Sequence, residues 1–261
     1  MSGKDDYYNR AKQAGYRARS AYKLKQLDET AGLFGSGNTV VDLGAAPGGW
    51  LQVAAEKVDE HGTVVGVDRQ RIDPLEDHDN VELVRGDLTE ESTIDDVVDR
   101  VGATAEERPV DVVISDMAPN MTGDYDLDHA RSVHLARQAF EVADRVLAPG
   151  GDFAVKVFDG KDLDDLQDDV EAQFEYVRQV RPKASRDSSS ELYLVGKGYL
   201  TAPVREGDTL EVDIVDIGSD GDGVAKVEGY TLFVGGVEEG DTVEVRVDDV
   251  KPNFGFAQPV E

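Results

Sequence analysis

Two residues of opposite charge occur where a buried strand does not usually carry them. Lys156 lies inside the apolar run Asp152–Phe158, which predicts a buried strand. An ionised amine there is costly unless it meets a carboxylate or loses its charge. Asp116 follows the apolar run Val110–Ile114, so it is placed at the end of another strand. Neighbouring parallel strands would bring both side chains to the edge where open α/β sheets bind ligands. The alternative is a lysine that extends to solvent from a strand end.

A glycine-rich corner precedes this pair in the chain. Residues 39–50 read Thr-Val-Val-Asp-Leu-Gly-Ala-Ala-Pro-Gly-Gly-Trp, which predicts a buried strand, a tight turn and a helix start. Backbone N–H groups at such a corner can face a ligand. Gly44, Gly48 and Gly49 do not have the spacing of the dinucleotide fingerprint. Asp42 would repel a pyrophosphate, whereas a cationic ligand without phosphate, such as S-adenosylmethionine, fits. The alternative is an ordinary turn without a ligand.

Two further acids follow predicted strands. Asp68 ends the run Thr63–Asp68, where a carboxylate can accept both hydroxyls of a ribose or simply cap the strand. Asp87 follows Val81–Val84 and could accept from an adenine amino group or form an Asx turn. Both acids are therefore candidates for binding the cofactor.

The elements that must position these residues alternate between strand and helix. This alternation predicts an α/β fold with a doubly wound, mostly parallel, seven-stranded Rossmann-like sheet. After about Gly198 the pattern changes to short strands separated by glycines, which predicts a small OB-like β-barrel. We expect one domain at residues 1–198 and a second at 199–261.

The net charge is −28, from 55 acidic and 27 basic residues spread along the whole chain. We interpret this as adaptation to molar salt, where charge repulsion is screened within about 3 Å and a hydrated acidic surface preserves solubility. The alternative is an ordinary acidic protein.

Several classes of protein are excluded by composition. The absence of cysteine rules out disulfides and thiolate catalysis, and the 4 histidines lack the spacing of a metal site. No run of about 18 apolar residues predicts a membrane span, and the first residues do not form a signal peptide. We expect a cytoplasmic protein with no metal and no membrane contact.

Residues 1–25 depart from the acidic pattern, with seven basic residues against two acidic ones. Tyr7, Tyr8, Tyr16 and Tyr22 are interleaved with the bases, a combination that suits phosphate contact and base stacking. The alternative is a solvated helical face whose aromatic rings pack into the core.

Four motifs together resemble the RrmJ/FtsJ family of ribosomal-RNA ribose 2′-O-methyltransferases, in its haloarchaeal type. They are Val-Asp-Leu-Gly-Ala-Ala-Pro-Gly-Gly-Trp, Ser-Asp-Met-Ala-Pro-Asn, Leu-Ala-Pro-Gly-Gly and Val-Lys-Val-Phe, within a similarity over about residues 5–197. The segment Asp213–Phe256 resembles a TRAM domain, an RNA-binding β-barrel. The resemblance implies a catalytic set of Lys23, Asp116, Lys156 and Glu191. It implies donor contacts at Gly48, Trp50, Asp68, Asp87 and Asp116.

The resemblance implies methylation of a uridine ribose in large-subunit (23S) ribosomal RNA, either free or in the assembled subunit, with S-adenosylmethionine as the donor and no DNA partner. We expect Lys156, buried and close to Lys23, to act as a neutral general base that Asp116 orients. Glu191 would orient Lys23 or the ribose. The alternatives are a tRNA ribose methyltransferase and a non-catalytic ribosome-assembly factor; a nicotinamide dehydrogenase is disfavoured by the glycine spacing.

The RNA contacts are expected to extend to the barrel. Phe233, Phe254 and Phe256 are candidate platforms for base stacking, with burial in the core of the barrel as the alternative.

Overall fold

The computed structural model describes residues 4–104, 107–186 and 189–260. Its helices are α1 (Lys4–Gln13), α2 (Ala21–Ala31), α3 (Gly49–Val58), α4 (Glu91–Val101), α5 (Tyr125–Val146) and α6 (Leu163–Glu171). The strands of the sheet are β1 (Thr39–Leu43), β2 (Thr63–Asp68), β3 (Val81–Arg85), β4 (Val110–Ser115), β5 (Leu147–Phe158), β6 (Phe174–Val180) and β7 (Glu191–Tyr199). The strands of the barrel are β8 (Thr209–Ile217), β9 (Gly223–Val227), β10 (Tyr230–Val234), β11 (Thr242–Val250) and β12 (Phe254–Pro259).

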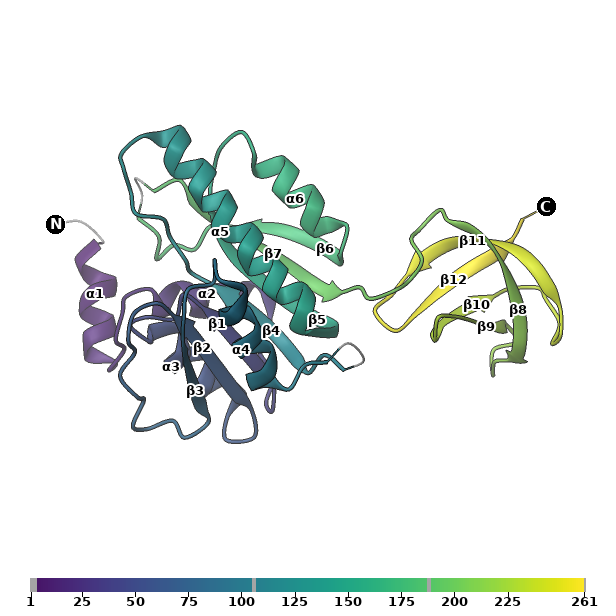
Figure 1. Cartoon of the computed structure of the whole chain (residues 1–261), viewed down its shortest axis with the longest axis horizontal. Helices are drawn as coiled ribbons and strands as arrows, with labels where there is room; N and C mark the ends of the chain where they lie inside the picture. The colour runs from purple at the N-terminus through teal and green to yellow at the C-terminus, as the bar shows by residue number, and fades with distance from the viewer. Residues whose placement is uncertain (1–3, 105–106, 187–188, 261) are drawn as a thin grey trace.

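The first part of the chain is a sheet covered by helices on both faces (Figure 1). Within the described residues it has seven strands in the order β3-β2-β1-β4-β5-β7-β6. Neighbours from β3 to β5 are parallel, and β7 runs antiparallel between β5 and β6. The prediction of a doubly wound, mostly parallel, Rossmann-like sheet of seven strands is confirmed.

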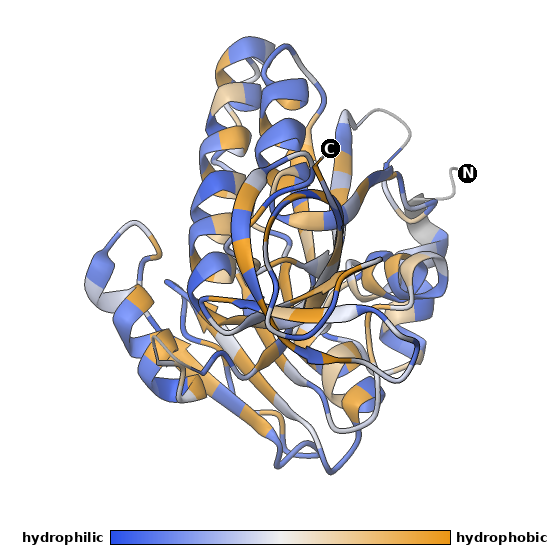
Figure 2. Ribbon diagram, turned by 90° about the vertical axis from the view of Figure 1, so that its right-hand side faces the viewer, coloured by the Kyte–Doolittle hydropathy of each residue, from blue (hydrophilic) through white to orange (hydrophobic). Residues whose placement is uncertain are grey.

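The two faces of the sheet are packed by different helices. One face packs against α2 and α3, through residues such as Leu24 and Leu51. The other face packs against α4, α5 and α6. Side chains alternate between the faces along each strand, so Lys156 shares the α2–α3 face with Ala154, and Asp42 shares it with Val40. Figure 2 shows the helices alternating between apolar and hydrophilic positions, as this packing requires.

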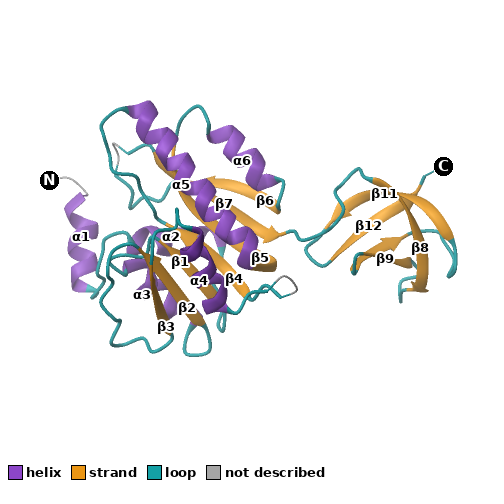
Figure 3. Cartoon of the chain, viewed as in Figure 1, coloured by secondary structure: helices purple, strands orange, loops and turns teal. Residues whose placement is uncertain are grey.

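The second part of the chain is a closed barrel with strand order β10-β12-β11-β8-β9 (Figure 3). Its core contains mainly small and branched side chains, for example Ile214, Leu232 and Val245. The sequence predicted the barrel but not β12. In this strand Gly255 and Ala257 are buried while Phe254 and Phe256 point outward, so the polarity pattern is the reverse of a normal half-buried strand.

The starts of two elements are set by backbone contacts. The strand predicted at Asp152–Phe158 is longer in the structure, because β5 already starts at Leu147. Ser20 occupies the N-cap position of α2 without a capping hydrogen bond from its side chain. Its carbonyl oxygen instead accepts from the indole N–H of Trp50, at 2.8 Å.

The barrel is joined to the edge of the sheet at which β5 begins and β7 ends. Arg205 donates to the carbonyl oxygen of Ala172 at 2.8 Å, and the ammonium group of Lys251 lies 4.0 Å from the carboxylate of Glu175. Within the described residues, no helix has both the length and the apolar character needed to cross a bilayer.

Candidate active site

The structure places Lys156 and Asp116 in contact. Strands β4 and β5 are neighbours with Ser115 opposite Val155, so the next residue of each strand lies at the same carboxyl edge of the sheet. The Nζ atom of Lys156 donates to Oδ1 of Asp116 at 2.8 Å and to the Asp116 carbonyl oxygen at 2.5 Å. The Lys156 side chain is only 7% exposed, so its charge is held by these partners and not by solvent.

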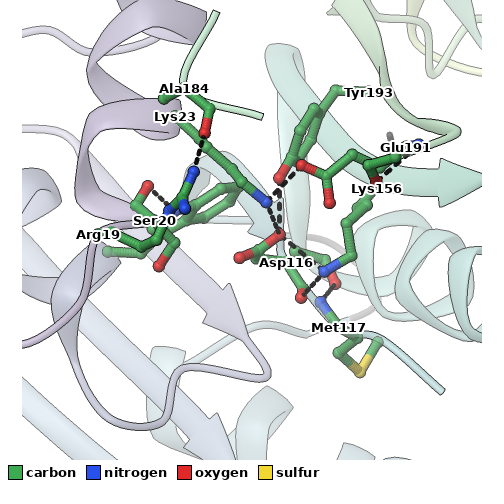
Figure 4. A network of polar contacts seen from close by, with 12 residues as sticks. Arg19, Ser20, Lys23, Asp116, Met117, Lys156, Ala184, Glu191 and Tyr193 are labelled. Atoms are coloured by element: carbon green, nitrogen blue, oxygen red, sulfur yellow. Dashed lines mark hydrogen bonds and ion pairs between the residues drawn. The ribbon is translucent and has the colours of Figure 1, made fainter. Parts of the chain in front are cut away.

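A second ion pair lies beside the first (Figure 4). Lys23 comes from α2, which packs on the face of the sheet that Lys156 shares, and Glu191 is the first residue of β7. The Nζ atom of Lys23 lies 2.6 Å from Oε1 of Glu191 and 3.9 Å from Oδ1 of Asp116. The four residues that the family resemblance named therefore form one cluster of two ammonium groups and two carboxylates.

Tyr193 also belongs to this cluster, although the sequence analysis did not select it. Its hydroxyl donates to Oδ1 of Asp116 at 2.6 Å, and its buried ring packs against Trp50 with 5.8 Å between centroids. The sequence did contain an indication of this role. Side chains alternate along a strand, so Tyr193, two residues after Glu191, must face the same side of the sheet.

The charges fix the protonation of two members of the cluster. Burial alone would raise the pKa of Asp116, but the ammonium groups of Lys156 and Lys23 outweigh it and hold the pKa below its ordinary value. Burial, followed by the negative charges of Asp116 and Glu191, raises the pKa of Tyr193 well above its ordinary value. Asp116 is therefore an anion that accepts hydrogen bonds, and Tyr193 is a neutral donor.

The glycine corner lies next to the cluster. Gly44 and Gly48 have φ values of 81° and 107°, in the left-handed region that favours glycine. A Cβ atom on Gly44 would lie 2.4 Å from Cγ of Met117, the residue after Asp116. The Trp50 ring is buried, and its indole N–H is hydrogen-bonded to the carbonyl oxygen of Ser20. The group of Trp50 that can reach a ligand is therefore its backbone N–H, in the first turn of α3.

Asp42 is the most unusual residue of the corner. It is fully buried at the end of β1, and neither carboxylate oxygen has a hydrogen-bond partner within the described part of the chain. Burial, followed by the charges of Asp116 and Asp68, raises its pKa well above the ordinary value. A buried acid without a partner, next to glycines that leave the backbone open, fits a cationic ligand better than a phosphate.

Asp68 and Asp87 have local partners. The Oδ2 atom of Asp68 accepts from the backbone N–H of Ala46 at 3.0 Å, so this acid ties β2 to the glycine corner. The Oδ1 atom of Asp87 accepts from the backbone N–H and hydroxyl of Thr89, at 3.1 and 2.9 Å. These contacts form the Asx turn, one of the two alternatives that the sequence analysis gave for Asp87. Contacts of either acid with a donor remain predictions.

The tyrosines of the basic N-terminal segment are mostly engaged within the chain. The rings of Tyr7 and Tyr22 lie 5.6 Å apart, with the Arg10 guanidinium over both. The Tyr16 hydroxyl donates to Glu56 at 2.6 Å. Tyr8 is 59% exposed. Lys4, predicted as part of the basic segment, begins α1, but its side chain lies outside the described part of the structure.

The strand order with an antiparallel β7, the glycine corner and the charged cluster define the class of the protein, a Rossmann-like methyltransferase. Within the described residues, no group of three His, Asp or Glu side chains could hold a metal ion. The chain belongs to the FtsJ-like methyltransferase family, which matches residues 16–199, and it carries a TRAM domain at residues 203–260.

Relatives over the full length support this membership. The chain is 72% identical to a Haloarcula marismortui protein named ribosomal RNA large subunit methyltransferase E, with 100% of both chains covered. It is 49% identical to a protein of the same name from Methanosarcina mazei, over 99% of this chain and 93% of that one. The crystal structure of a Plasmodium falciparum protein described as a ribosomal RNA methyltransferase has a TM-score of 0.61 and 25% identity, over 70% of this chain and 98% of that one.

Proposed function

We propose that this chain methylates the 2′-hydroxyl of a uridine ribose in large-subunit ribosomal RNA and takes the methyl group from S-adenosylmethionine. The names of the full-length relatives support ribosomal RNA as the substrate. The observation that carries the proposed chemistry is the buried contact between Lys156 and Asp116, beside the unpartnered Asp42.

The corner residues fit the donor. Asp42 would attract its positive charge, while Gly44, Gly48 and the N–H of Trp50 would allow close backbone approach. Asp68 is the last residue of β2 and Asp87 lies two residues after β3, and they would hold the ribose and the base of the donor. When bound, S-adenosylmethionine supplies an activated methyl group, so this chain has to align the hydroxyl and remove its proton.

Lys156 is the proposed general base; its ammonium group must first lose a proton to solvent, and the neutral amine then takes the proton of the ribose hydroxyl. Asp116 fixes the direction of the Lys156 amine through two hydrogen bonds, and Tyr193 and Lys23 fix Asp116 in turn. A base held in this way contributes about 10²–10⁴-fold to a rate. Glu191 holds Lys23 beside the same edge, where its ammonium group can orient the ribose or an adjacent phosphate.

The two parts of the chain would divide the work. We propose that residues 1–198 carry out methyl transfer and that residues 199–261 bind RNA. The charged cluster lies wholly within the first part, and the barrel contributes none of its residues.

Replacement of Lys156 tests the proposed chemistry. Lys156→Arg keeps the charge and the partner Asp116 but cannot accept a proton, so methyl transfer should fall about 10²-fold or more while donor binding stays within about threefold. The measurement is mass-spectrometric mapping of 2′-O-methyl marks on ribosomal RNA and tRNA from strains that carry the parent protein or the variant. It shows both the loss of methyl transfer and which RNA is the substrate. Near-normal turnover by the variant would remove Lys156 from the role of base, and marks lost only from tRNA would reassign the substrate.

A further inference from the structure

Three large apolar side chains are exposed in the segment that follows Asp116. Met121, Tyr125 and Leu127 are 64%, 57% and 42% exposed, and they belong to the loop after β4 and the first turn of α5. Exposed apolar side chains that gather in one place indicate an interaction site. The segment therefore offers apolar surface directly after a residue of the charged cluster.

The Tyr125 side chain is fastened to the ends of the strands that carry the cluster. Its hydroxyl donates to the carbonyl oxygen of Asp159, at 2.6 Å. Asp159 directly follows β5, and its backbone N–H donates to the carbonyl oxygen of Ser190 at 2.8 Å, next to Glu191 at the start of β7. Lys156 lies three residues before Asp159, and three residues of extended chain span about 10 Å. The point that holds the ring is therefore within about 10 Å of the proposed base.

The turn after β5 that holds the tyrosine ring is itself fixed by a buried histidine. The Nε2 atom of His129 accepts from the backbone N–H of Asp162 at 3.1 Å, which leaves Nδ1 to donate to the carbonyl oxygen of Phe158 at 2.8 Å. A Cβ atom on Gly160 would lie 2.4 Å from the imidazole, so the turn packs directly on it. The carbonyl oxygen that accepts from the tyrosine thus has a fixed position, and the ring is oriented before any ligand arrives.

The charges around the ring favour a base over a phosphate. Asp124 and Asp126 flank Tyr125 in the chain, and both are exposed, so they would repel a phosphate group. The nearby cation, Arg181, is already paired with the carboxylate of Asp159, at 2.7 Å. What the ring offers to a nucleotide is therefore its uncharged π-face.

We propose that the Tyr125 ring is the platform on which the base of the methylated nucleotide stacks, which positions its ribose at the charged cluster. The inference rests on the proposed function for its RNA substrate and names a residue that recognises the target nucleotide. Stacking tolerates every base, because each base has a π-face. Tyr125 therefore requires that a base is present and unpaired, while the choice of uridine falls to other contacts.

The hydroxyl and the ring of Tyr125 can be tested separately in the full chain. Tyr125→Phe removes the hydrogen bond to Asp159 and keeps the π-face, whereas Tyr125→Leu removes both. The value of kcat/KM for large-subunit ribosomal RNA should fall by about tenfold or more in the leucine variant, and by less than about threefold in the phenylalanine variant. Equal losses in the two variants would assign Tyr125 to holding the turn and would overturn the proposal, as would no loss in either.

Tyr176→Leu is the matched control. Tyr176 is 51% exposed, but it lies on β6 opposite Lys197, toward the end of β7 that leads to the barrel. Figure 1 shows the start of α5 at the other end of the sheet, away from the barrel. The control should keep kcat/KM within about twofold of the parent, and calorimetric titration should give all four proteins the same Kd for S-adenosylmethionine. A control that loses as much as Tyr125→Leu would overturn the proposal.

A second test changes the RNA and separates this inference from the proposed function. Large-subunit ribosomal RNA is assembled by ligation with an abasic site at the methylated nucleotide or at either neighbour. The parent should lose about tenfold in kcat/KM when the base of the methylated nucleotide is missing, whereas Tyr125→Leu should lose little more, because the same contact is already absent. Methyl transfer by the parent with losses that simply add at the methylated nucleotide would overturn the platform and leave the methyltransferase intact. Absence of methyl transfer by the parent on the unmodified RNA would overturn the proposed function and this inference with it.

Discussion

At the scale of single residues, a half-buried and a fully buried aspartate of the same site have opposite properties. Asp116 accepts from Lys156 and Tyr193, and its pKa is lowered because the nearby ammonium groups outweigh burial. Asp42 has no such partner, and its pKa is raised well above the ordinary value. Asp116 is therefore stabilised as an anion by the fold, whereas Asp42 is destabilised as an anion until a cation binds.

Asp42→Asn should stabilise the protein at neutral pH and weaken donor binding. A carboxyl whose pKa is raised by folding contributes stability below its unfolded pKa of about 3.9 and loses that contribution as pH rises through the folded pKa. The melting temperature of the variant should exceed that of the parent at pH 7, by roughly 2–4 °C for each kcal/mol gained, and the two should converge below about pH 4. Thermal unfolding against pH, with calorimetric titration of S-adenosylmethionine, measures both effects. A variant less stable than the parent at pH 7 would contradict the assignment.

The residues of the charged cluster differ in how far the sequence alone could predict them. Lys156 and Asp116 could be selected because Lys156 interrupts an apolar run and Asp116 directly follows another. Their contact could then be predicted from the order of the strands. Lys23 and Glu191 came only from the family resemblance, since a lysine on an amphipathic helix and a glutamate at a strand start carry no distinctive pattern. Tyr193 was missed because an aromatic residue in a buried strand is ordinary, and only its hydroxyl contact to Asp116 reveals its part.

At the scale of elements, apolar runs predicted the strands of the sheet because both of its faces are buried. Strand β12 could not be predicted in this way. Its large side chains point outward and its small ones inward, so no hydrophobic alternation marks it as the strand that closes the barrel. The ends of elements also differ from the prediction where backbone pairing, and not composition, sets them. At β5, for example, the strand starts at Leu147 and not at Asp152.

Arg17 connects three segments around the glycine corner. Its guanidinium group donates to the carbonyl oxygens of Pro47 at 3.3 Å, Asp73 at 2.5 Å and Pro74 at 2.6 Å. The segment before α2 is thereby fastened both to the corner and to the loop that follows Asp68. The loop is held by an arginine from outside the region expected to bind the donor.

Arg17→Ala should raise the KM for S-adenosylmethionine by about tenfold, which corresponds to about 1.4 kcal/mol, while kcat at saturating donor changes less than about twofold. Arg71→Ala removes the same charge from an exposed position of the same loop and should leave both constants unchanged. Steady-state kinetics with varied donor concentration make the comparison. A fall in kcat with an unchanged KM would show that Arg17 acts on the RNA side and not on the donor loop.

At the scale of the whole molecule, the charge of −28 sets the conditions in which the fold is stable. Self-repulsion of the acidic surface opposes the compact state and is screened within about 3 Å at 1 M salt. The melting temperature should therefore rise by roughly 5 °C or more between about 0.2 and 2 M KCl, and NaCl at equal ionic strength should act similarly. Differential scanning fluorimetry across this range tests it. A flat response would mean that the acids are an ordinary composition and not an adaptation to salt.

Strand β7 is inserted between β5 and β6, although it follows both in the chain. Its first residue completes an ion pair with a lysine from the second helix. During synthesis, the sheet therefore stays without its penultimate strand until the chain has been made as far as Tyr199. A nascent or prematurely terminated chain that stops before β7 contains Lys156 and Asp116 but lacks the ion-pair partner of Lys23 and the hydroxyl that donates to Asp116. The charged cluster is therefore completed only when the two ends of the α/β unit have joined.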